Sequence, residues 1–245
     1  MTKLRLLVLV ALSFLVAEAL AQNPMVMPNR VGLAWFSGQF TYKHNDKLSV
    51  NVGEQFRIKS AFKLYDRSFT WIEGNYKPIK SLNLGFEYRY MFVNDDQGGV
   101  HEVEQHQRFA FKLSHRFKIN RLTIKNRIQW QNRIERLPDT HIILSDQRKY
   151  LRLKSSFGYN IPKWKFDPKA SAELFIARPK DVERQQNKYR FSLGTEYKIK
   201  KGHQIRASYI FEREIISWNP DIEHIISLKY VYTLKRKPKP KDEED

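Results

Sequence analysis

The sequence contains no cysteine, and beyond its N-terminus it has no apolar run long enough for a membrane-spanning helix. The lack of cysteine excludes a disulfide framework and a lipid anchor carried by cysteine. The GxxxxGKS, GxGxxG and HExxH patterns are also absent, so nucleotide-binding and zinc-protease functions have no support. Acidic residues are few, 26 against 44 basic ones, which gives a formal net charge of +18. What remains to be interpreted is the alternation of residues along the chain.

The N-terminus has the layout of a secretory signal peptide. Lys3 and Arg5 provide the positive start, residues 6–16 the apolar run, and Ala19-Leu20-Ala21 a small-x-small cleavage site. The run is short for an uncleaved transmembrane helix, and an acidic residue interrupts its end. We therefore expect residues 1–21 to be removed and residues 22–30, with two prolines, to form an irregular lead-in.

Residues 80–92, KSLNLGFEYRYMF, show the alternation most clearly. Period-two alternation is typical of a β-strand, because successive side chains point to opposite faces of the sheet. The stretch exceeds the nine to eleven residues that a tilted strand needs to cross a bilayer. One face carries charged or small residues and predicts a polar lumen, while the other predicts contact with lipid. The expected lipid-facing residues are Leu82, Leu84, Phe86, Tyr88, Tyr90 and Phe92.

Similar segments recur along the chain and predict an all-β protein with a single antiparallel transmembrane β-barrel. Eleven candidate strands lie within residues 31–234, although the faces of residues 64–76 cannot be assigned. Connections near residues 44, 78, 120, 162 and 201 are tight, and those near 98, 141, 182 and 219 are longer. Eleven strands would place the two termini on opposite sides of the membrane, so we expect 10–12 strands and favour twelve. Residues 235–245, KRKPKPKDEED, predict a charged disordered tail.

This layout resembles the bacterial outer-membrane barrels grouped as domain of unknown function 2490. The resemblance covers residues 30–234 and includes Trp35, Arg57, the strand at 85–90, His106, Arg108 and the segment 127–136 around Glu135. It implies a β-barrel in the outer membrane. It implies no catalytic residues, because the family has no established activity.

The charges on the inner faces of the strands are the main candidate site. Carboxylates enclosed in a narrow lumen should pair with guanidinium groups, because unpaired charge there is costly. The excess of bases leaves two interpretations open, an ion-pair ladder that fills the barrel and a passage that prefers anions. The expected network contains Glu87, Arg89, Arg108, Lys112, Arg116, Lys125, Arg127, Arg133, Glu135, Arg152, Glu173, Arg190, Glu196, Arg206 and Glu212.

Other functions have weaker signals. A nucleic-acid interface should gather its bases on one exposed surface, whereas here they alternate with aromatic residues. A soluble lipocalin-like barrel would place its apolar face inside and its charges outside. The enzyme alternatives are an omptin-like surface protease, suggested by Asp139-Thr140-His141 with Asp95-Asp96, and an outer-membrane lipid hydrolase. No Ser-x-His or His-x-Ser pair supports the hydrolase. Asp95, Asp96, His101 and Glu102 form a weak calcium-loop pattern.

The sequence thus predicts a non-catalytic barrel in the bacterial outer membrane, with a structural role or passive passage of small solutes or anions. The alternative is a surface enzyme built on the outer loops. We expect no catalytic residue, no metal and no cofactor. The expected partners are outer-membrane lipids, lipopolysaccharide and a small anionic solute, with no nucleic acid.

Overall fold

Eleven strands account for most of the part of the chain that the structure describes. This structure is a computed structural model that describes residues 30–59, 64–95, 102–136, 143–177, 187–215 and 220–236. The strands are β1 (Arg30–Lys43), β2 (Leu48–Lys59), β3 (Leu64–Tyr76), β4 (Leu82–Asp95), β5 (Glu102–Ile119), β6 (Leu122–Arg136), β7 (Ile143–Tyr159), β8 (Phe166–Ala177), β9 (Asn187–Lys200), β10 (His203–Ile215) and β11 (Ile222–Lys235). The expected signal peptide, residues 22–29 of the lead-in and residues 237–245 of the tail lie outside the described residues.

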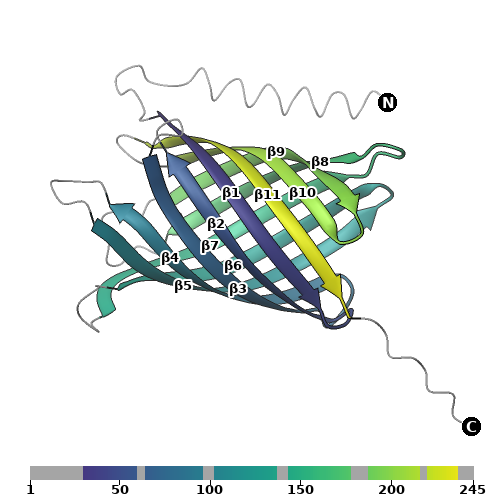
Figure 1. Ribbon diagram of the computed structural model, residues 1–245, viewed down its shortest axis with the longest axis horizontal. Helices are drawn as coiled ribbons and strands as arrows, with labels where there is room; N and C mark the ends of the chain where they lie inside the picture. The colour runs from purple at the N-terminus through teal and green to yellow at the C-terminus, as the bar shows by residue number, and fades with distance from the viewer. Residues whose placement is uncertain are drawn as a thin grey trace, which may run out of the picture.

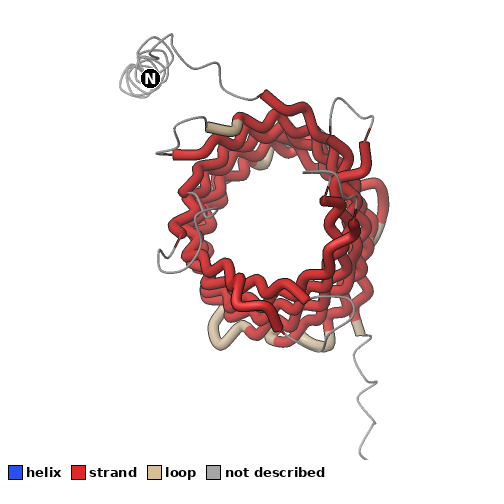
Figure 2. The backbone as a smooth tube through the Cα atoms, turned by 90° about the vertical axis from the view of Figure 1, so that its left-hand side faces the viewer, coloured by secondary structure: helices blue, strands red, loops and turns tan. Residues whose placement is uncertain are grey.

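The strands close into one barrel, which confirms the predicted all-β fold (Figures 1 and 2). Neighbours in sequence pair antiparallel, and β1 pairs with β11 in parallel over its whole length. One parallel pair is unavoidable when an odd number of otherwise antiparallel strands closes. The favoured count of twelve is not confirmed, because within the described residues β1 contacts β11 directly. No helix in this part of the chain is long and apolar enough to cross a membrane.

The two ends of the barrel differ in their connections. At the turn end, strands are joined by residues 44–47, 77–81, 120–121, 160–165 and 201–202. Two-residue turns need a left-handed backbone, and Asn120 (φ 52°) and Gly202 (φ 87°) adopt it. The loop end is where β1 begins and where β2, β4, β6, β8 and β10 end. Lys235 ends β11 at the turn end, so β1 starts and β11 finishes at opposite ends of the barrel (Figure 1).

The strand whose faces the sequence left unassigned, β3, carries aromatic residues on its inner face. Phe69 and Trp71 point into the barrel, where they pack with Met91 and Val93 of β4. A register shift near Arg57 then lets two consecutive residues, Asp66 and Arg67, both line the interior. The alternation of β3 is therefore poor because its inner face mixes aromatic and charged residues and because the register shifts near its start.

A cysteine pair tests the closure between β1 and β11. Thr41 lies directly opposite Thr233 in the parallel pair, and the natural sequence contains no cysteine. A disulfide needs Cα atoms about 4.4–6.8 Å apart, whereas an intervening twelfth strand would separate them by about 9–10 Å. We expect Thr41→Cys/Thr233→Cys to crosslink under mild oxidation, as seen by non-reducing gel migration. Thr41→Cys/Thr123→Cys, which joins β1 to β6, should stay uncrosslinked, and the reverse result would contradict the eleven-strand closure.

Candidate functional site: the charged interior of the barrel

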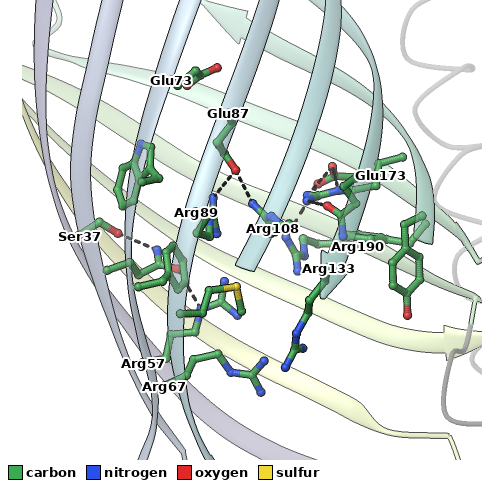
Figure 3. Close-up of a pocket in the computed structure, with 18 of the residues that line it drawn as sticks. Ser37, Arg57, Arg67, Glu73, Glu87, Arg89, Arg108, Arg133, Glu173 and Arg190 are labelled. Atoms are coloured by element: carbon green, nitrogen blue, oxygen red, sulfur yellow. Dashed lines mark hydrogen bonds and ion pairs between the residues drawn. The ribbon is translucent and has the colours of Figure 1, made fainter. Parts of the chain in front are cut away.

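The barrel encloses a cavity of about 1100 Å³, and every one of the eleven strands contributes residues to its lining. Its lining includes sixteen Lys or Arg side chains and seven Asp or Glu side chains. Arginines and glutamates from β2 to β9 project toward one another across it (Figure 3). The interior is therefore strongly basic, and the cations outnumber the carboxylates with which they can pair.

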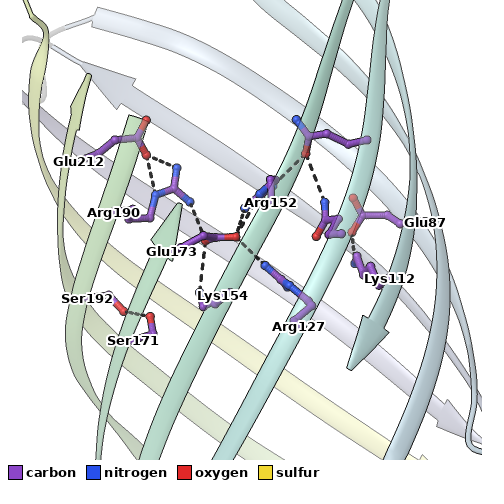
Figure 4. Close-up of polar contacts among 12 residues, drawn as sticks. Glu87, Lys112, Arg127, Arg152, Lys154, Ser171, Glu173, Arg190, Ser192 and Glu212 are labelled. Atoms are coloured by element: carbon purple, nitrogen blue, oxygen red, sulfur yellow. Dashed lines mark hydrogen bonds and ion pairs between the residues drawn. The ribbon is translucent and has the colours of Figure 1, made fainter. Parts of the chain in front are cut away.

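Glu173 on β8 is the centre of the largest ion-pair cluster (Figure 4). Its side chain is 1% exposed, and its Oε1 atom accepts hydrogen bonds from Arg127 Nη2 and Arg152 Nη2, both at 2.8 Å. Lys154 Nζ and Arg190 Nη1 lie 3.6 and 3.9 Å from Oε2. Four cations thus share one carboxylate, which is a net positive arrangement even after pairing.

Glu87 on β4 is the second such centre. Its Oε1 atom lies 2.5 Å from Arg108 Nη2 and 3.1 Å from Arg89 Nη2, and its Oε2 atom 2.7 Å from Lys112 Nζ. Lys112 also bridges to Glu73, with Nζ 2.9 Å from Oε1. Glu73 faces Glu87 directly across β3 and β4. The lysine therefore offsets the repulsion between two opposed carboxylates.

Two further carboxylates on the β9–β10 side have the same kind of surroundings. Glu212 pairs with Arg190 and with Lys188, whose Nζ lies 2.5 Å from Oε1. Glu196 pairs with Lys169 and with Arg206, whose Nε lies 3.1 Å from Oε2. Both glutamates are buried. Glu212 and Glu196 are thus each shared by two cations.

Cross-strand register explains why these groups meet. A single row of directly opposed residues crosses six strands and carries the Glu173 and Glu212 clusters. Directly opposed side chains on one sheet face lie close enough for charge pairing. We call this the paired row. In order from β6 to β11 it contains Arg127, Lys154, Glu173, Arg190, Glu212 and Glu223.

A second row, the arginine row, carries only positive charge. Arg89, Arg108, Arg133 and Arg148 oppose one another on β4, β5, β6 and β7. Like charges directly opposite destabilise a sheet. Glu87 neutralises only the first two of these arginines through the contacts given above. The arginine row therefore carries like-charge repulsion at every step, whereas the paired row carries it only between Arg127 and Lys154 and between Glu212 and Glu223.

Eleven of the fifteen predicted network residues take part in ion pairs in the described part of the chain. The other four are Arg116, Lys125, Arg133 and Glu135, and no ion pair within the described ranges includes them. Sequence reasoning missed Arg67 and Glu73, because β3 was unassigned. It also left out Lys188, although Lys188 continues the inward alternation of β9.

A group of possible metal ligands lies near the loop end. Donor atoms of Glu104, His106 and Glu135 lie within 4.8 Å of one another, and His106 Nε2 is 2.7 Å from Glu104 Oε2. Arg133, Arg148 and Arg67 exert electrostatic repulsion on positive charge at His106, which opposes a bound cation. The donor set is chemically suitable for a metal, but its electrostatic surroundings are not.

The residues of the enzyme alternatives lie largely outside this description. Asp96, His101, Asp139, Thr140 and His141 are outside the described residues, and the side chains of Asp95 and Glu102 are not described. The surface protease, the lipid hydrolase and the calcium loop therefore stay predictions.

Comparison with known proteins identifies the family. Residues 32–215 match the model described as a protein of unknown function, DUF2490. The chain belongs to the DUF2490 family. The family that the sequence resembles is thus confirmed by the match of the family model. A search of curated proteins gives no match. Among solved structures, the β-domain of the Bordetella autotransporter BrkA is similar, with 15% identity, a TM-score of 0.48 and coverage of 76% of this chain and 82% of that chain.

Neutralising Glu173 should destabilise the barrel. Glu173→Gln would leave Arg127, Arg152 and Lys154 crowded without their counter-charge. Breaking a buried pair typically costs about 3–5 kcal/mol, and less where water screens it. We expect a lower unfolding temperature, measured by heat-dependent gel migration of the folded protein. Glu54→Gln is the matched control, because Glu54 is exposed on the outer face. Equal effects of both changes would contradict the central role of Glu173.

Proposed function

We propose that this DUF2490 protein is a non-catalytic barrel of the bacterial outer membrane whose basic lumen passes small anions. The observation that carries this proposal is the excess of sixteen bases over seven acids around the cavity. Pairing consumes the carboxylates, since Glu87 and Glu173 are each surrounded by three or more cations. The surplus positive charge raises the local concentration of anions and lowers that of cations.

The outer surface supports the membrane location. Every strand exposes large apolar side chains on its outer face, among them Phe36, Phe86, Phe111, Leu193 and Ile226. Soluble monomers rarely expose continuous apolar surface of this extent. An apolar band around the whole circumference is what lipid tails require of a barrel.

Aromatic residues at the turn end add to this support. Tyr76, Tyr159 and Trp164 are exposed there by 47%, 44% and 58%. Tyr and Trp favour the boundary between lipid tails and headgroups, where an apolar ring and a polar edge are both satisfied. The remaining members of this belt are Tyr42, Tyr197 and Tyr232. Lipids and lipopolysaccharide are accordingly the proposed partners of the outer face.

Ion selectivity tests the proposal. Folded protein reconstituted in a planar bilayer under a KCl gradient should conduct with a reversal potential that indicates preference for chloride. Lys125→Glu should weaken this preference, because Lys125 lines the cavity without an ion-pair partner in the described structure. Lys165→Glu, in an exposed turn outside the cavity lining, should leave the preference unchanged.

Preference for potassium would contradict the basic-lumen proposal. Absence of any conductance from correctly folded protein would show that the side chains close the lumen, and would leave a structural role.

A further inference from the structure

We propose that Arg57, Arg67 and Arg133 form a binding site for a phosphate-like oxyanion in the loop-end half of the lumen. This inference rests on the proposed anion-binding character of the lumen and adds to it a place and a ligand class. We call these three residues the arginine site. They come from β2, β3 and β6, so only the closed barrel brings them together.

The arginine site places three positive charges around one directly paired carboxylate, that of Asp66. Arg57 directly opposes Arg67, and Arg133 stands between Arg108 and Arg148 in the arginine row. Arg67 exerts the largest repulsion from a charged neighbour on both Arg133 and Arg57, and Glu104, Glu135 and Asp66 offset part of the repulsion. Figure 3 shows the three guanidinium groups gathered on one side of the cavity, away from Glu87 and Glu173. The site therefore carries a net positive charge that a bound anion would balance.

The hydrogen-bond inventory leaves many donors available. Arg57 donates from Nε to Gln55 Oε1 at 2.9 Å, and its ring and ion-pair contacts in the described structure include no carboxylate. Arg67 uses Nε and Nη2 on Asp66, at 2.7 and 3.1 Å, which leaves Nη1. Arg133 has a buried Nε atom without a hydrogen-bond partner in the described structure. A buried donor left unsatisfied is costly, so a ligand that accepts from it gains this energy.

Aromatic rings hold part of the site in place. The guanidinium carbon of Arg57 lies 3.8 Å from the centroid of Trp35 and 5.1 Å from that of Phe69. Stacking occupies the flat face of a guanidinium group and leaves the N–H groups at its edge free to donate. The donors of Arg57 are thus oriented before a ligand arrives, which reduces the entropy lost on binding.

The donor geometry indicates the ligand class. Guanidinium groups bind oxyanions through paired N–H···O bonds, whereas chloride offers no oxygen pair to match the fork. A tetrahedral oxyanion with two negative charges can accept from three arginines at once. Phosphate itself and a phosphate group on a small solute share this chemistry. The interior position favours a soluble ligand over a lipid headgroup.

The nearby acids do not complete the site. Asp66 is occupied by Arg67, and Glu104 contacts His106 through the 2.7 Å bond given above. The cluster of Glu104, His106 and Glu135 sits on the row next to the arginine row, as the register of β5 and β6 shows. These acids reduce the local positive potential but leave the free donors of Arg57 and Arg133 unmatched.

The test is binding of inorganic phosphate to folded protein in detergent at constant ionic strength. Thermal unfolding and calorimetric titration should show saturable stabilisation by phosphate beyond that given by chloride. Arg133→Gln should weaken phosphate affinity at least tenfold. Without phosphate, this variant should unfold at the same or a higher temperature, because it relieves like-charge crowding. Arg133→Lys keeps the charge but loses the fork, and it should recover only part of the affinity.

Lys125→Gln is the matched control, since it removes an unpaired positive charge from the other half of the lumen. It should retain phosphate affinity within about twofold. Equal loss in Lys125→Gln and Arg133→Gln, or no phosphate effect in the natural protein, would overturn the site. An Arg133-dependent effect of micelles containing phosphatidic acid, without one of inorganic phosphate, would also overturn it in favour of a headgroup.

Further variants and a separate readout keep the phosphate test decisive. If Arg133→Gln fails to fold, Arg57→Gln and Arg133→Lys provide the same comparison. The binding assay needs no conductance, so a barrel that does not conduct can still bind phosphate. Conversely, chloride-selective conductance without phosphate binding would refute the arginine site and leave the proposed passage standing.

Discussion

Charge enclosed by a narrow barrel must be neutralised close by, because moving an unpaired charge out of water costs several kcal/mol. This constraint accounts for the arrangement of the lumen. Glu173 collects four cations and Glu87 three, so a few carboxylates organise many bases. Glu87 links two strands, β4 and β5, and Glu173 links four, β6 through β9. The same contacts that stabilise the interior therefore also hold the strands in register.

Ion pairing does not neutralise all the positive charge of the lumen, and the remaining positive charge is unevenly distributed. The paired row uses alternating signs across β8, β9 and β10, whereas the arginine row places four like charges side by side. The position of Arg133 between two arginines does not contribute to the stability of the free protein through its opposed neighbours. Groups that destabilise the free protein are common where a ligand completes the site. This contrast is the physical basis of the proposal that the loop-end half of the lumen binds anions.

Aromatic residues have two distinct roles in this barrel. On the outside, they form the apolar band and the belt at the turn end. Inside, Trp35, Phe69 and Trp71 support the flat faces of arginines. The small residue Gly53 makes the inner arrangement possible, since a Cβ atom there would lie 2.4 Å from the ring of Trp71. The interior is therefore a layered structure of rings and guanidinium groups as well as a network of ion pairs.

The sequence by itself determined the class of fold and the two faces of most strands. Period-two alternation needs no tertiary information, because each side chain's face follows from its position along the strand. For this reason both faces of the strand within residues 80–92, observed as Leu82–Asp95, could be assigned, whereas residues 64–76 were predicted as a strand without assigned faces. The tertiary structure decided the pairing of β1 with β11 and the register of every row. Glu173 meets Arg190, and Arg133 meets Arg108, only once the register of the neighbouring strands is set. Alternation says that a charge points inward, but only the positions of the neighbouring strands decide whether it finds an opposite charge.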